Sequence, residues 1–167
     1  MNGSPVVIAA VPKSRYIAIA VFSAQSLIYY KICSVVSRQQ NRLLKTSGLI
    51  EYFVRRYQPQ LLAIESLIYA QQQTSGLLAL SEEIAKSAQR AGIEVDFYSP
   101  VDVRSSLFSD KRGNKFQAAY KLIELYPELV PYLNPTNSNP QQYGLLLFNA
   151  VALGLYAVRT LQHKRTL

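Results

Sequence analysis

The chain has 167 residues, of which 49% are hydrophobic and 17% charged, so it is long enough for one packed domain and is not disordered in composition. Its 18 lysines and arginines exceed its 10 acids, and the resulting net charge of +8 favours a polyanionic partner such as nucleic acid. A single cysteine, Cys33, and a single histidine, His163, exclude an intrachain disulfide and a cysteine- or histidine-rich metal site, and they argue against a Ser-His-Asp triad.

Three apolar runs at the start of the chain are typical of strands. The first, Val6 to Val11, is stopped by Pro12, and the second covers Tyr16 to Phe22. The third, Leu27 to Val35, is rich in tyrosine and β-branched residues. The connection Ser23 to Ser26 is short enough for a hairpin. We therefore expect an antiparallel meander of three strands.

The hydrophobic period then changes to that of a helix. Thr46 or Ser47 is a suitable residue to cap the start of this helix, and Pro59 lies just beyond its end. The apolar positions follow the spacing i, i+3, i+4 and i+7, and they are Ile50, Phe53, Val54 and Tyr57.

Strands and helices alternate in the middle of the chain. Gln60 to Glu65 is an apolar strand that ends on an acid. A helical period covers Thr74 to Arg90 and is stopped by Gly92. Ile93 to Tyr98 is the next strand, which ends at Ser99-Pro100, and Asp102 is expected in the turn that follows.

The last part of the chain is predicted to be helical. A polar, basic loop, Ser109 to Asn114, precedes a helix over Lys115 to Tyr126. Tyr132 to Gln142 is expected to be an exposed connection, and a final helix starts with Asn139 as its cap and continues to about Gln162. Its apolar stretch, Leu145 to Val158, is expected to fall short of a membrane span and to form a buried helix.

Together these elements predict one α/β domain over residues 1–167. Three meandering strands followed by alternating helices and strands give a mixed five-stranded sheet, in which parallel strands join the antiparallel meander and helices cover both faces. The order of elements alone is compatible with several α/β topologies.

Four segments, taken in this order, resemble motifs of the RuvC family of Holliday-junction resolvases, whose fold is ribonuclease-H-like. Near the N-terminus, Pro12, Ser14 and Arg15 match the family's first turn, but Val11 stands at the position of its catalytic Asp and Lys13 at that of its turn Gly. The resemblance implies that Glu65 corresponds to the catalytic Glu of the second motif.

The resemblance continues to the last helix. Lys115 and Gln117 match the Lys and Gln that open the next helix of the family. In the closing motif, Phe148 and Val151 stand where the family has two Asp residues. Three of the four carboxylates that the resemblance implies are therefore absent from this chain.

These replacements argue against a metal-dependent reaction. Hydrolysis with two metal ions needs several carboxylates, and Glu65 alone cannot supply them. We therefore expect no catalytic residue, no metal site and no cofactor, with Glu65 as a vestige that pairs with Lys13 or points into solvent. The alternative is a divergent endonuclease that uses Mg²⁺ on Glu65 and on the unmatched acids Asp96, Asp102 or Asp110.

Several residues are candidates for contact with nucleic acid. Lys111, Arg112 and Lys115 cluster around a glycine, and flexible cations suit phosphate binding, although such a run can also be a solvated loop. Tyr69 follows the Glu65 strand and could stack on a base or pack in the core. Lys13 and Arg15 lie in the turn beside the position of the lost Asp.

The sequence thus favours a catalytically inactive RuvC-like protein that binds structured or branched nucleic acid, DNA rather than RNA. The resemblance also implies a homodimer, and the absence of a basic leader before the first strand predicts a cytoplasmic protein without membrane contact. The divergent endonuclease and a protein-interaction scaffold that kept only the fold are the alternatives.

Overall fold

The computed structural model describes residues 3–68, 74–133 and 140–167. Its five strands form one sheet in the order β3-β2-β1-β4-β5, with β1 at the centre. The strands are β1 (Val6–Pro12), β2 (Tyr16–Ser23), β3 (Ser26–Ser34), β4 (Leu61–Glu65) and β5 (Glu94–Tyr98). The helices are α1 (Gln39–Tyr57), α2 (Ser75–Arg90), α3 (Pro100–Ser105), α4 (Lys115–Leu125), the 3₁₀ helix η1 (Pro127–Tyr132) and α5 (Pro140–Thr166).

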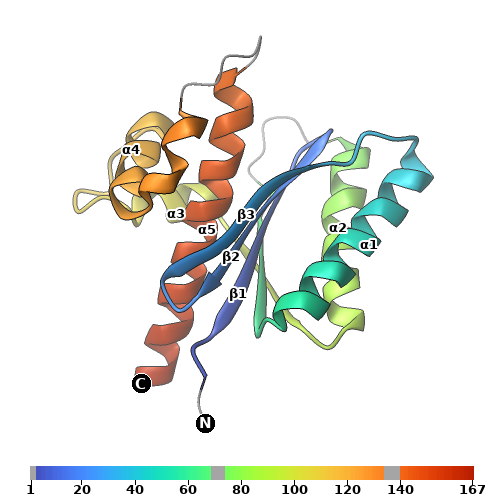
Figure 1. The fold of residues 1–167 in the computed structure, drawn as a ribbon, viewed down its shortest axis with the longest axis horizontal. Coiled ribbons are helices and arrows are strands. Elements are labelled where there is room, and N and C mark those ends of the chain that lie inside the picture. Colours follow the sequence, from blue (N-terminus) through green and yellow to red (C-terminus); the bar gives the residue numbers. More distant parts are fainter. Residues whose placement is uncertain (1–2, 69–73, 134–139) are drawn as a thin grey trace.

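The pairing of the strands confirms the predicted mixed sheet. β1, β2 and β3 are antiparallel neighbours, whereas β4 pairs in parallel with both β1 and β5. Helices cover both faces, with α1 and α2 on one side of the sheet and α3, α4 and α5 on the other (Figure 1).

Strand alternation divides the core between the two faces. On β1, Val7, Ala9 and Val11 face the core beneath α5, while Ile8 and Ala10 face the core beneath α1 and α2. Close contact between α5 and the sheet depends on Gly154, because a Cβ there would lie 2.4 Å from the ring of Phe22 and 3.3 Å from the Cβ of Ala9.

Helix α1 begins earlier than the sequence indicated, so neither Thr46 nor Ser47 caps it. The helix starts at Gln39, and its N-cap, Arg38, makes no side-chain capping bond. Thr46 is instead fully buried in the helix, and its hydroxyl donates to the carbonyl oxygen of Arg42 at 2.8 Å.

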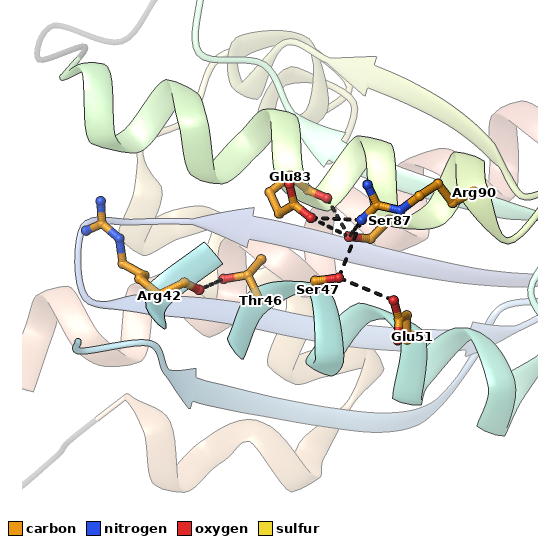
Figure 2. Close-up of polar contacts among 7 residues, drawn as sticks. All are labelled: Arg42, Thr46, Ser47, Glu51, Glu83, Ser87 and Arg90. Carbon is orange, nitrogen blue, oxygen red and sulfur yellow. Dashed lines mark hydrogen bonds and ion pairs between the residues drawn. The ribbon is translucent and has the colours of Figure 1, made fainter. Parts of the chain in front are cut away.

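A polar network joins α1 to α2 on their outer surface (Figure 2). The guanidinium of Arg90 lies 2.8 Å from a carboxylate oxygen of Glu83 and also donates to the hydroxyls of Ser47 and Ser87. Ser47 in turn donates to Glu51. Because Arg90 is exposed while Ser87 is buried, the network lies at the edge of the contact between the two helices, where we expect it to help fix their register.

Later elements confirm two predicted helix starts and add one helix. The side chain of Thr74 caps α2, and Asn114 with Gln117 forms a reciprocal capping box at the start of α4. The segment after Ser99 is not a turn but the short helix α3, so Asp102 lies in a helix.

The predicted stretch Leu145 to Val158 lies within the longer helix α5, which passes a test for a membrane span by length and composition alone but packs in the core, as the sequence predicted. In the most apolar window of Gly144–Thr166, 67% is buried against the rest of the molecule. The predicted cap Asn139 and much of the predicted connection before α5 lie outside the described residues.

Candidate functional site

The carboxyl ends of β1 and β4 meet at one edge of the sheet. Ala10 pairs with Ile64 in parallel, so the next residues along these strands, Val11 and Glu65, are neighbours. Both follow the alternation that places Ala9 and Ala63 on the α5 face. The side chains of Val11 and Glu65 therefore point toward the same helix.

The positions of the missing acids are part of the core. Val11 and Val151 are 0% exposed and Phe148 is 3% exposed, and all three belong to the cluster between the sheet and α5. They do not close the site, however. A cavity of about 1100 Å³ lies above them, with Phe148 in its wall.

The charged groups in this cavity are mainly cations. Its described lining includes four basic residues and one acid, Glu65. Lys13 and Arg15 come from the turn after β1, Arg104 from α3 and Lys115 from the first turn of α4. The uncharged polar residues in this lining are Ser14, Tyr16, Ser66, Thr74 and Asn149.

Glu65 is buried beside Lys13. Its carboxylate oxygen Oε2 lies 3.7 Å from Lys13 Nζ, and the two side chains are 11% and 49% exposed respectively. Burial raises the pKa of Glu65 above its ordinary value, although the positive charges of Lys13, Lys115 and Arg104 act to lower it. Desolvation of Glu65 therefore outweighs the effect of these three cations on its pKa.

The donor set does not fit a divalent metal ion. Within residues 3–68, 74–133 and 140–167, no group of three or more His, Cys, Asp or Glu side chains lies close enough to hold one. The nearest charged partner of Glu65 is an ammonium group, and positive charges repel a cation.

The unmatched acids that could have replaced the lost ligands lie elsewhere. None of Asp96, Asp102 and Asp110 is among the residues that line the cavity. Asp96 accepts a hydrogen bond from the hydroxyl of Tyr98, and Asp110 accepts one from the backbone of Arg112 at 3.0 Å. Asp102 is exposed on α3.

The structure separates the basic cluster predicted from the sequence. Lys115 lines the cavity, whereas Lys111 and Arg112 are exposed on the loop before α4 and do not line it. Lys13 and Arg15 lie at the cavity, as the turn position implied. Tyr69 lies outside the described residues.

Sequence reasoning missed Arg104 and Asn149. Arg104 was overlooked because the segment after Ser99 was assigned to a turn, although Ser-Pro followed by an acid is a helix start. Asn149 stands between two apolar replacements in a strongly apolar helix, and this lone amide was a usable signal.

Comparisons with known proteins agree with this geometry. A family model described as crossover junction endodeoxyribonuclease RuvC matches residues 12–134. The crossover junction endodeoxyribonuclease RuvC of Mycobacterium leprae is 32% identical over 79 residues, a stretch that covers 46% of this chain and 42% of that protein. The chain thus spans less than half of the length of this relative.

Solved structures show the same ribonuclease-H-like fold. Thermus thermophilus RuvC superposes with a TM-score of 0.72 at 16% identity, covering 95% of this chain and 96% of that one. The same protein in complex with a Holliday junction substrate gives 0.69 at 17% identity, with the same coverage. The yeast mitochondrial Holliday junction resolvase Ydc2 gives 0.66 at 9% identity, covering 98% of this chain and 83% of that one.

Proposed function

This chain belongs to the RuvC family of crossover junction endodeoxyribonucleases, and we propose that it binds branched DNA in the basic cavity without cutting it. The observation that carries the proposal is the composition of the cavity, whose described lining has four basic residues and one carboxylate. A nucleic-acid backbone needs such cations, whereas metal-assisted hydrolysis needs carboxylates.

Two further observations support the proposal. The net charge of +8 gives the whole molecule an attraction for polyanions. A related protein of the same fold has been solved in complex with a Holliday junction substrate, so this architecture is compatible with that ligand. The divergent endonuclease has less support, because Asp96, Asp102 and Asp110 do not line the cavity.

Binding and cleavage are tested separately. The protein is titrated against a four-way DNA junction, a duplex and a single strand of equal length, with EDTA or with Mg²⁺. We expect the junction to bind most tightly in both buffers and to remain intact in Mg²⁺ or Mn²⁺. Cleavage products that disappear on Glu65→Gln would establish the endonuclease instead, and the absence of a shift at low salt would favour the scaffold.

The loop cations allow a second test of the binding mode. A plot of log affinity against log salt concentration has a negative slope, because phosphate contacts release counterions. Replacing Lys111, Arg112 and Lys115 by Ala should reduce the magnitude of that slope by about two to three. A matched control removes three exposed cations from α1, on the other face of the sheet, by replacing Lys45, Arg55 and Arg56. Equal loss of slope in both variants would show general charge attraction instead of a defined interface.

Three finer expectations belong to the same proposal. DNA should bind more tightly than an RNA junction of the same sequence, and titration of both measures this. A homodimer is expected, which sedimentation of the free protein tests. A cytoplasmic location is expected, which cell fractionation tests.

A further inference from the structure

Lys13 occupies a distinctive place in the cavity. It follows Pro12, the last residue of β1, and its backbone N–H donates to the carbonyl oxygen of Tyr16 at 2.8 Å, which closes the turn. The ammonium group lies 3.7 Å from Glu65, and the side chain remains 49% exposed. An ammonium group has three N–H donors, so contact with one carboxylate leaves donors that can reach a ligand in the cavity.

Two more cations approach Glu65 from other elements. Arg104 on α3 and Lys115 on α4 line the same cavity, and both influence the ionisation of Glu65. With Glu65 ionised, the group of Lys13, Arg104 and Lys115 still carries an excess of two positive charges. A phosphodiester carries one negative charge, so the cations alone can neutralise it.

The lone carboxylate has the wrong sign for such a ligand. In a metal-dependent site it would support binding by holding the cation that contacts the phosphate. Here no described residues provide the rest of a metal site, so a phosphate in the cavity would face Glu65 directly. Like charges repel, and a largely buried carboxylate is poorly screened.

We infer that the cavity holds a phosphodiester of the DNA backbone without a divalent ion, on Lys13, Arg104 and Lys115, and that Glu65 weakens this binding. The inference rests on the proposed DNA-binding function, and it adds the ligand group, the contacting side chains and a reversed role for the one remaining family carboxylate.

The test measures the affinity of the full chain for a fluorescent four-way DNA junction in EDTA. Glu65→Gln should tighten binding roughly three- to tenfold, the effect of removing one unit charge near a phosphate in a partly hydrated site. The matched control is Glu51→Gln, which removes the same charge from an exposed position on α1 and should change affinity less than about twofold.

Two variants of Lys13 give an independent readout. Lys13→Met should weaken binding roughly five- to tenfold, and Lys13→Arg, which keeps the charge, should stay within about twofold of the parent. Replacing EDTA by Mg²⁺ at constant ionic strength should change the affinity of the parent by less than about twofold. Thermal unfolding confirms that each variant is folded.

The outcomes distinguish failure of the inference about Glu65 from failure of the proposed DNA-binding function. If the parent binds the junction but Glu65→Gln weakens binding, or behaves like Glu51→Gln, the reversed role of Glu65 is wrong while DNA binding stands. A requirement for Mg²⁺, or no effect of Lys13→Met, likewise overturns the inference alone. If the parent binds no DNA even at low salt, the proposed function fails and the inference falls with it.

Discussion

Returning the missing carboxylate to β1 should strongly destabilise the protein. Val11 is fully buried in the core beneath α5. In Val11→Asp, the loss of its apolar burial costs about 1.5–3 kcal/mol. Keeping the new carboxyl protonated at about pH 7, when its unperturbed pKa is about 3.9, costs about 4 kcal/mol more. Ion pairing with Lys13 would reduce that second penalty, so about 4 kcal/mol is its upper limit.

Val11→Asn separates the charge from the change in shape and polarity. Both variants lose the apolar contacts, but only Asp ionises. Burial raises the folded-state pKa of the introduced carboxyl above its unfolded value, so the ionisation penalty is absent below about pH 4 and grows as the pH rises through the folded-state pKa. The two variants should therefore be equally stable in acid and diverge toward neutral pH.

Urea unfolding across this pH range measures the difference. A penalty of several kcal/mol is a large part of the free energy of unfolding of an ordinary domain, which is about 5–15 kcal/mol, so Val11→Asp should be at the limit of folding at neutral pH. If Val11→Asp is as stable as Val11→Asn and the parent at neutral pH, the new carboxylate is solvated and the packing of this position has been misjudged.

Three other substitutions test separate parts of the structure. Gly154→Ala should lower the free energy of unfolding by about 1–3 kcal/mol, because its Cβ would lie 2.4 Å from the ring of Phe22, and an unchanged melting temperature would contradict the close packing of α5. Gln58→Gly should raise that free energy by about 0.5–1 kcal/mol in urea unfolding, because Gln58 ends α1 with a φ of 46° that glycine adopts without strain. Glu65→Gln should be more stable than the parent at neutral pH and equal to it in acid. Burial raises the pKa of Glu65, so the stability contributed by its protonated form is present below the unfolded pKa and lost as the pH rises through the folded one. If the parent instead becomes more stable relative to Glu65→Gln as the pH rises, the ion pair with Lys13 outweighs the cost of burying the carboxylate.

The central strands β1, β2 and β4 were predictable because they are continuous apolar runs bounded by turn or polar residues. The start of α1 was not, because its first two turns are mostly polar and its N-cap, Arg38, makes no capping bond. The helical period becomes clear only near Ile50, so the cap was predicted at Thr46, which is later in the chain than the observed start of the helix. Thr46 is buried as an internal residue of the helix.

The cavity was only partly predictable. Strand order and register place Glu65 beside Val11, and both positions were recognisable in the sequence. The convergence of Lys13, Arg104 and Lys115 depends on where α3 and α4 pack against α5, which no local pattern specifies. The same packing separates Lys115 from Lys111 and Arg112, although these residues are close in sequence.

The substitutions at this site, relative to the family pattern, all make its charge more positive. Relative to the family pattern, three carboxylates are replaced by apolar residues and a turn glycine by Lys13, which together make the region four charges more positive. The sheet does not depend on those charges, because Val11 and Val151 pack in the core and β4 still places Glu65 at its carboxyl end. An arrangement of strands that positions acids around a metal ion can therefore position cations around a phosphate. Under the proposed function, Lys13 adds a positive charge beside Glu65 to a cavity that Arg15, Arg104 and Lys115 already line, and we expect this charge to strengthen the attraction for a phosphate.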